Sequence, residues 1–300
     1  MENSILILYQ SNFLNNSKQL LNHHRFQSSI NQSINQSIII NHQSKKRTIM
    51  FKLITTLAVL LTGLLASAQN TEVRKSNTAT RIEVQNGIEV IFTQQDTPSL
   101  MVETDKPEKL RNVITEFNGK TLKIYLKDKE ESLSTAQPYA KLKVYVGQKE
   151  ISSFKAIAGA SIKFKNDLIL PEVSVTLGSG GSFQGDIKAV KRCSITTTSG
   201  SAYTGKIHTS ELNGSFKSGS SIKIHGYAVT SKINTASGAT FQSNKLVTDN
   251  ATINAQQNSS VSISVTTSLH AKTDNSSSIL YFGDPKKIEM DENSYAIYKN

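Results

Sequence analysis

Three histidines follow residue 68, and they are the first candidates for metal chemistry because neutral imidazole is a common metal ligand. They are His208, His225 and His270. His208 follows Ile207 and His225 follows Ile224, so a repeating fold could place these two side chains on adjacent turns. A two-histidine metal site is one interpretation, and solvated outward side chains are the other. We predict the second, with no metal-binding residues.

Carboxylates at repeat spacing would suit acid–base chemistry on glycans, because glycosidases use paired carboxyl groups. Asp167 and Asp186 occupy comparable positions, and Lys206 takes the corresponding place one repeat later. They can equally be solubilising residues at bends, which is the interpretation we favour. The stretch from Gly178 to Gly181 is not a dinucleotide loop, because no helix follows it. We therefore predict no catalytic residues, no cofactor and no cofactor-binding residues.

Cys193 is the single cysteine, so an internal disulfide and Cys-based metal centres are excluded. It lies beside Ile195, near an apolar column of the repeat, which predicts a small buried core residue rather than a reactive thiol. Four aromatic residues fall on or near apolar positions of the repeat, and we expect them to stack in the core. A carbohydrate platform is their alternative role. They are Phe183, Tyr203, Phe216 and Phe241.

A short bend motif recurs and implies the elements that position these side chains. The apolar residue that closes each motif falls at 162, 183, 203, 222, 241, 261 and 279, with spacings between 18 and 21. The second motif position is glycine five times, then asparagine, then serine, which predicts a repeated bend with positive φ. We assign these residues as structural bends: Gly159, Gly180, Gly200, Gly219, Gly238, Asn258 and Ser276.

Short alternating stretches follow the bends, as in Ile222-Lys223-Ile224, and indicate strands with one buried face. A further apolar column contains Val175, Ile195, Ile233 and Ile253, with Leu212 and Phe216 straddling the expected place in the middle repeat. Three short strands in roughly 20 residues describe one coil of a parallel β-helix. We predict an all-β fold, a right-handed parallel β-helix (solenoid) with a β-rich N-terminal cap.

The mature chain, 69–300, is predicted to be a single domain, because no Pro/Gly linker divides it. Residues 71–150 contain longer alternating strands around Asn86-Gly87 and form the opening coils or an N-terminal cap. Residues 151–283 form the repeat coils, and 284–300 form a closing cap. An exposed sheet edge invites aggregation, so caps are required at both ends.

Residues 50–68 have the three parts of a secretory signal peptide: Lys52, the apolar run Leu53–Leu65, and Ala66-Ser67-Ala68. Thirteen residues are too few to span a membrane of about 30 Å. Residues 1–49 contain a tandem polar tetrapeptide, and we interpret them as an over-extended gene model; a long basic leader is the alternative. An exported protein follows, periplasmic, at the outer cell surface or extracellular.

The formal net charge of +11 does not indicate nucleic-acid binding. Six of the 34 Lys and Arg residues and one of the 23 Asp and Glu residues precede residue 69. The remaining chain therefore carries 28 bases against 22 acids, spread without a basic run. We predict no nucleic-acid partner and no transmembrane segment in the mature chain.

The leader, the opening Ile82-Glu83-Val84-Gln85-Asn86-Gly87-Ile88-Glu89-Val90 and the Ser-Gly-Ser repeats together resemble the "putative auto-transporter adhesin, head GIN domain" family. The resemblance covers roughly residues 80–298. It implies a right-handed β-helix, and it offers no catalytic residues to transfer to this chain.

These observations predict a non-catalytic secreted or cell-surface protein, adhesin-like or structural. It would present Ser/Thr/Asn ladders to glycans or envelope proteins. A glycan-active enzyme, a polysaccharide lyase or hydrolase on the same scaffold, is the alternative, and a self-associating envelope scaffold is the second. An acidic cluster over adjacent coils would favour the enzyme, and an exposed aromatic groove would favour glycan binding.

Overall fold

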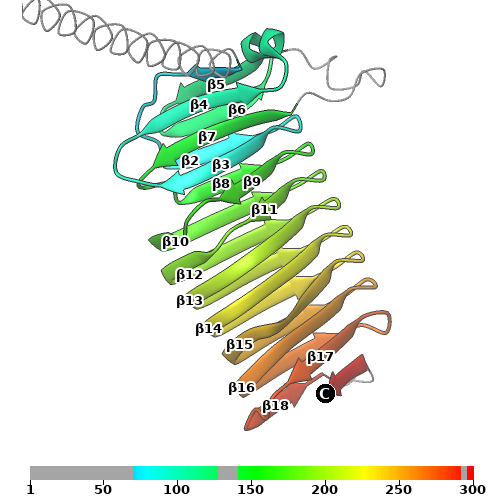
Figure 1. Cartoon of the computed structure of the whole chain (residues 1–300). Helices are drawn as coiled ribbons and strands as arrows, with labels where there is room; N and C mark the ends of the chain where they lie inside the picture. The colour runs from blue at the N-terminus through cyan, green and yellow to red at the C-terminus, as the bar shows by residue number, and fades with distance from the viewer. Residues whose placement is uncertain (1–69, 128–140, 292–295) are drawn as a thin grey trace, which may run out of the picture. The chain divides into compact units, whose positions relative to one another are not determined.

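The computed structural model describes residues 70–127, 141–291 and 296–300 (Figure 1). Strands hold 66% of these residues and helix only 3%, which confirms the all-β prediction. The predicted signal peptide, 50–68, and the upstream extension, 1–49, lie outside the described residues.

The repeat region forms a β-solenoid of about seven turns. Each strand pairs in parallel with the strand one coil later, and Figure 1 shows the coils following one another from green to red. The predicted parallel coils, one for each repeat of the bend motif, are thus confirmed. The main strands are β10 (Leu168–Leu177), β12 (Ile187–Thr197), β13 (Ala202–Phe216), β14 (Ser221–Thr235), β15 (Thr240–Ala255) and β16 (Ser260–Thr273); shorter ones are β8 (Ser153–Ala156), β9 (Ser161–Phe164) and β11 (Ser182–Gln184).

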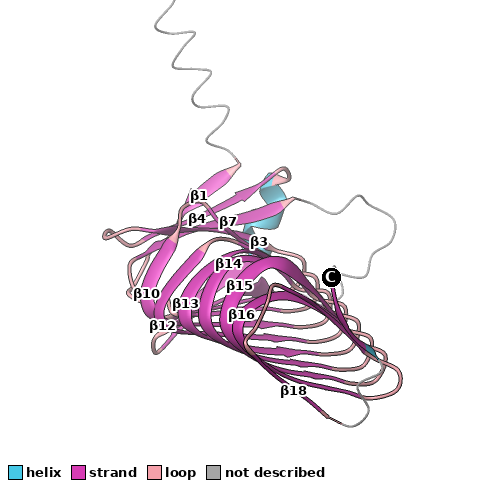
Figure 2. Cartoon of the chain, turned by 90° about the horizontal axis from the view of Figure 1, so that it is seen from below, coloured by secondary structure: helices cyan, strands magenta, loops and turns pink. Residues whose placement is uncertain are grey.

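Strict alternation of side chains explains why this polar chain can build a core. In β13, the residues from Ala202 to Thr209 alternate between exposed and buried, as a strand with one face inward must. Seen from below in Figure 2, the strands curve around a common interior, and the bends project along one edge. Alternate side chains along each strand therefore point into the core, and the side chains between them point to solvent.

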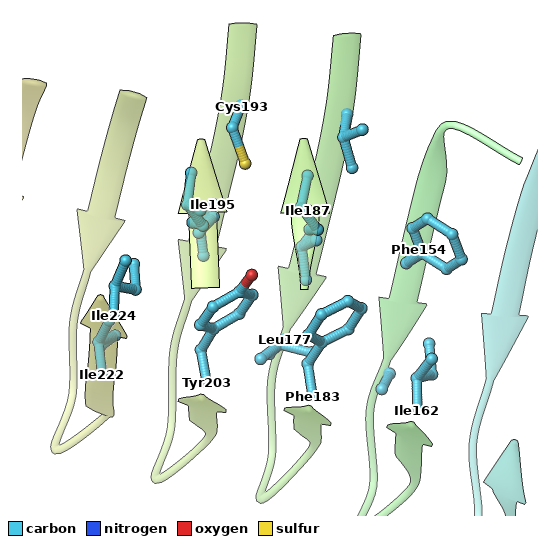
Figure 3. Close-up of a cluster of buried hydrophobic side chains, with 14 of the residues drawn as sticks. Phe154, Ile162, Leu177, Phe183, Ile187, Cys193, Ile195, Tyr203, Ile222 and Ile224 are labelled. Atoms are coloured by element: carbon cyan, nitrogen blue, oxygen red, sulfur yellow. The ribbon is translucent and has the colours of Figure 1, made fainter. Parts of the chain in front are cut away.

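The apolar residues that close the bend motifs stack as one buried column, as predicted. Ile162 pairs with Phe183, Phe183 with Tyr203, and Tyr203 with Ile222. The rings of Phe183 and Tyr203 lie parallel, with centroids 5.0 Å apart and an interplanar angle of 7° (Figure 3). The column continues through Phe241, Val261 and Ile279.

The second predicted column has an unexpected residue in its middle repeat. Ile195 pairs with Gly214, and Gly214 pairs with Ile233. Leu212 and Phe216 straddle this position, and both are fully buried. A glycine fits here because an added Cβ would lie 2.5 Å from Cζ of Phe216, so the aromatic ring fills the space that an isoleucine fills in neighbouring coils.

Residues before 151 form both the first coil and a cap. β2 (Arg81–Val84) and β3 (Glu89–Gln94) flank Asn86-Gly87 and stack in parallel on β8 and β9. On their other side they pair in parallel with β6 (Thr121–Leu126) and β7 (Leu142–Gln148). The Asn86-Gly87 turn is therefore the first bend of the solenoid.

The cap changes the direction of pairing at the N-terminal end. β4 (Ser99–Thr104) is antiparallel to β7 and to β1 (Thr71–Val73), and β5 (Val113–Asn118) is antiparallel to β6. A short 3₁₀ helix, η1 (Pro107–Asn112), joins β4 to β5. The Arg74 guanidinium donates to the carbonyl oxygens of Leu110 and Val113, which ties the first described strand to this cap.

The tail predicted as a closing cap adds a further, partial coil to the stack. β17 (Ser278–Phe282) pairs with β16 and with β19 (Ile297–Lys299), and β18 (Lys287–Met290) pairs with β16, all in parallel. All four residues of β18 are exposed.

Candidate functional site

The bends form a continuous ladder along one edge. The backbone N–H of Gly180 donates to the carbonyl of Ser199, that of Gly200 to Ser218, and that of Gly219 to Ser237, each at 2.9 Å. The two central residues of these bends have positive φ, between 50° and 74°. Gly159, Gly238 and Asn258 also have positive φ, at 74°, 74° and 62°. The backbone groups that make the ladder are used between coils, so the bends present mainly serine and glutamine side chains to solvent.

The seventh bend, at Ser276, has a different conformation. Ser276 is not among the described residues with positive φ. Asp274 holds this bend instead, because its Oδ1 accepts the backbone N–H and the hydroxyl of Ser276, at 3.1 and 3.0 Å. Its Oδ2 accepts the backbone N–H of Gln257 at 2.6 Å. These hydrogen bonds, that from Gln257 foremost, lower the pKa of Asp274 to about 2.

The three histidines lie outward on separate columns. His225 pairs with Lys206, whereas His208 pairs with Tyr227, so the two histidines are offset by two residues on adjacent strands. Nδ1 of His270 lies 3.3 Å from a carboxylate oxygen of Glu289. Within the described ranges, no group of three or more His, Cys, Asp or Glu side chains could hold a metal ion.

Asp186 and Lys206 occupy successive places just before a shared buried column. Leu168, Ile187 and Ile207 pair in register, so the residues that precede them, Asp167 among them, follow one another along the stack. Oδ1 of Asp186 accepts the backbone N–H of Lys206 at 2.8 Å. This carboxylate therefore serves the bend, as the bend interpretation expects.

The residues for which the sequence left a reactive or sugar-binding role open are buried in the core. Cys193 is fully buried, and burial raises the pKa of its thiol to about 12, so it is protonated at neutral pH. The four aromatic residues weighed as a carbohydrate platform are at most 2% exposed, which makes that alternative wrong: Phe183, Tyr203, Phe216 and Phe241. They face inward because each closes a bend or precedes one at a core position.

A different aromatic residue faces outward. Tyr227 of β14 stands in an outward column between His208 of β13 and Val247 of β15. The rings of His208 and Tyr227 have centroids 5.7 Å apart and an interplanar angle of 37°. The Tyr227 hydroxyl donates to Oδ2 of Asp249 at 2.5 Å. We call His208, Tyr227, Val247 and Asp249 the outer patch.

Hydrogen bonds fix the polar end of the outer patch. Asp249 accepts the Tyr227 hydroxyl and also the Thr266 hydroxyl, the latter at 2.8 Å on Oδ1. These two bonds lower the pKa of Asp249, and the same carboxylate raises the pKa of Tyr227. At neutral pH the patch therefore holds a neutral ring beside a carboxylate. Lys188 pairs with His208 in this column, and Lys206 lies two residues before His208 in β13, so two lysines lie near one side of the patch.

The sequence analysis missed the outer patch because its residues lie in three different coils, and the register between β14 and β15 changes by one residue next to Tyr227. The register between β14 and β15 slips between Ile222 and Gly226. Gly226 has φ 115°, and its missing Cβ would lie 2.2 Å from the carbonyl oxygen of Ile207. This glycine lets β14 pass close to Ile207, and Tyr227 lies beside His208 because the register between β13 and β14 is unbroken. The one-residue change in register between β14 and β15 places Val247, rather than Leu246, beside Tyr227.

Two shallow polar grooves lie elsewhere on the solenoid. One, of about 470 Å³, crosses β2, β8, β10 and β12; in it Lys155 pairs with Glu83 at 3.9 Å, and Arg192 pairs with Glu211 at 3.0 Å. The other, of about 500 Å³, lies beside the bends and is lined by amides and hydroxyls, including those of Asn234 and Asn254. The second groove is rich in Ser, Thr, Asn and Gln, whereas five charged side chains line the first: Arg81, Glu83, Lys155, Glu172 and Arg192.

No helix in the part of the chain that the structure describes is long and apolar enough to cross a membrane.

A parallel β-solenoid with a filled core, a ladder of serine bends and polar outward columns defines the class of this protein. Within that class the match is specific: residues 79–285 match the family described as "Putative auto-transporter adhesin, head GIN domain". The chain belongs to this family, as the resemblance in its sequence predicted. No curated protein matches the chain.

Solved structures share the fold at low identity. A putative adhesin from Parabacteroides merdae is 15% identical with a TM-score of 0.68, covering 77% of this chain and 95% of its own. A putative lipid binding protein from Parabacteroides distasonis is 21% identical with a TM-score of 0.64, covering 78% and 98%. A putative adhesin from Bacteroides fragilis is 14% identical with a TM-score of 0.56, covering 77% and 95%. At these identities the likeness shows the fold alone.

Proposed function

We propose that this protein is a non-catalytic, adhesin-like protein of the cell exterior, and that the outer patch contacts a glycan. The family description and the names of two fold neighbours as putative adhesins support the adhesive role. The observation that carries the glycan contact is the outward ring of Tyr227, set between His208 and Val247 with the Asp249 carboxylate beside it.

The chemistry of the outer patch suits a sugar ring. A pyranose has an apolar face of C–H groups and an edge of hydroxyls, and an aromatic side chain with a polar tip matches both. Asp249 can accept sugar hydroxyls with the lone pairs that Tyr227 and Thr266 leave free. The bordering cations, Lys188 and Lys206, would favour a sugar that carries a carboxylate or sulfate. Envelope proteins remain the second partner class for the polar ladders.

Turnover is not favoured by the same geometry. Glycoside hydrolysis needs two carboxyl groups, one of which is protonated at working pH. Asp249 is the single carboxylate of the outer patch, and its lowered pKa keeps it ionised at neutral pH. The patch therefore lacks the pair of carboxyl groups that a glycoside hydrolase uses.

Export is part of the proposal. We propose that residues 50–68 direct secretion, that the mature domain begins at Gln69, and that residues 1–49 are not translated. Mass spectrometry of the precursor and the mature protein tests all three. A mature N-terminus at Gln69 is expected, and peptides from residues 1–49 would contradict the last point.

The experiment is a glycan-array screen of the protein purified after expression of the full chain. The same glycans are then incubated with the protein and assayed for newly released reducing ends or unsaturated sugars. We expect binding without release. Released sugar would make the enzyme alternative correct, and a blank array would contradict the glycan contact.

A further inference from the structure

The two ends of the solenoid differ in how they close the core. At the N-terminal end, antiparallel strands and η1 cover the interior, and Leu100 and Val113 are buried. At the other end β18 and β19 form the last, partial coil, and no strand of the described residues pairs with their outer edges. We call β18 and β19 the open end.

Side chains of β18 face the core direction, and no coil among the described residues covers them. Ile288 pairs with Leu269, and Met290 pairs with Ala271. Leu269 is 1% exposed and Ala271 is fully buried, whereas Ile288 is 43% and Met290 38% exposed. The difference is positional: the same inward column is covered in one coil and uncovered in the next. Terminal repeats of solenoids normally carry a polar outer face, so apolar side chains here call for a partner.

The outer edge of β18 also has backbone groups that no strand of the described residues pairs with. A strand at a sheet edge presents a row of unpaired N–H and C=O groups, which pair readily with another strand. All four residues of β18 are exposed. An apolar core end and an unpaired strand thus coincide on one segment, Lys287–Met290.

We propose that the open end binds a second copy of this chain, tail to tail, with β18 antiparallel to β18 of the second copy across a two-fold axis at Ile288. This register places Ile288 opposite Ile288 of the second copy and Lys287 opposite Glu289 of the second copy. Opposite charges directly across an antiparallel pair stabilise it, and like charges would destabilise it. The sequence of β18 is therefore complementary to itself, as a two-fold interface requires.

The charge pattern separates this pairing from a non-specific one. Within one chain Nζ of Lys287 already lies 2.7 Å from Oε1 of Glu289, so both side chains occupy the outward face of the strand. The apolar residues Ile288 and Met290 occupy the inward face and would continue the core into the second copy. The interface would thus extend both the sheet and the core through the two molecules.

Sedimentation over a concentration series tests the proposal, with the protein purified after expression of the full chain. The wild type should form a dimer, and Ile288→Asp should remain a monomer with an unchanged circular-dichroism spectrum. Val190→Asp is the matched control, because Val190 is 58% exposed on a corner far along the chain from the open end. It should dimerise as the wild type does.

Charge variants test the register itself. Lys287→Glu and Glu289→Lys each put like charges across the two-fold axis, so each alone should weaken dimerisation at least tenfold. An equimolar mixture of the two should form a heterodimer, because each strand then faces the opposite charge. Mixing the two variants restores no ion pair within either chain, so a recovery of dimerisation must come from the interface. A monomeric wild type, a dimer that survives Ile288→Asp, or a mixture that stays monomeric would overturn the proposal.

Discussion

Gly214 shows how one residue can shape a column of the solenoid. Its neighbours along the stack are Ile195 and Ile233, and the ring of Phe216 takes the volume that an isoleucine fills in those coils. A Cβ at 214 would lie 2.5 Å from Phe216 Cζ and 3.0 Å from Ile233 Cδ1. Glycine here serves core packing, since its φ is not positive.

Gly214→Ala should therefore destabilise the protein by roughly 1–3 kcal/mol through overpacking. Urea unfolding measures the change. Gly214→Ala combined with Phe216→Leu should cost less than the sum of the two single changes, because the smaller side chain makes room for the added methyl group. Additive effects would contradict the packing explanation.

Asp274 should make stability depend on pH at the last bend. Its folded pKa of about 2 lies below the unfolded value of about 3.9, so its contribution is present above about pH 4 and is lost as pH falls toward 2. The free energy of unfolding of Asp274→Asn should be lower than that of the wild type at pH 6. The gap should close between pH 4 and pH 2. A gap independent of pH would exclude the ionised carboxylate as its cause.

Core positions on the bend side were predictable because the motif marks them directly. Tyr203 and Cys193 lie beside recurring landmarks, and both are buried as predicted. The role of Gly214 and the grouping of the outer patch were not predictable, because both depend on contacts between coils, and because the register between β14 and β15 changes beside Tyr227. The sequence shows the period of the coils, but it does not show where the register between two neighbouring coils changes.

At the scale of the element, the first six bends of the motif have positive φ at two successive residues. Asn258 adopts φ 62° at the position that glycine holds in five other bends. Gly200 has φ 67°, and a Cβ added there would meet nothing within 4 Å, so conformation rather than space limits what this site accepts.

Gly200→Asn should therefore change the free energy of unfolding by less than about 0.5 kcal/mol, whereas Gly200→Val should lower it by roughly 1–2 kcal/mol. Chemical denaturation of the two variants gives the comparison. Equal losses for Asn and Val would show that positive φ is not what the bend selects.

The N-terminal strands β2 and β3 pair with strands that are distant from them in the sequence. β2 and β3 lie between β6 and β7 on one side and β8 and β9 on the other, so Ile82 pairs with both Leu122 and Phe154. The alternating pattern around Asn86-Gly87 predicted strands and a turn correctly. It could not specify partners so far along the chain, because strand pairing at that separation is decided by the assembled core.

At the scale of the whole molecule, the solenoid should tolerate the loss of a complete coil. Ala202 pairs with Ser221, so deletion of residues 202–220 joins equivalent positions. The shortened protein should retain a β-type circular-dichroism spectrum, unfold cooperatively, and show a smaller denaturant m-value because less surface is buried. Deletion of residues 202–211 removes half a coil and should abolish the native fold. Similar behaviour of the two deletions would contradict stacking in register.

The central claim is that the solenoid carries its function on an outward face, at the outer patch. The most direct measurement is the affinity of wild type and variants for the glycan that binds most strongly on the array. Tyr227→Ala should weaken binding about tenfold, a loss of roughly 1.4 kcal/mol, while Tyr227→Phe keeps most of it. Tyr125→Ala is the matched control, because Tyr125 also interacts with a carboxylate, Glu116, but lies in β6. Unchanged binding in Tyr227→Ala, or an equal loss in Tyr125→Ala, would contradict the account.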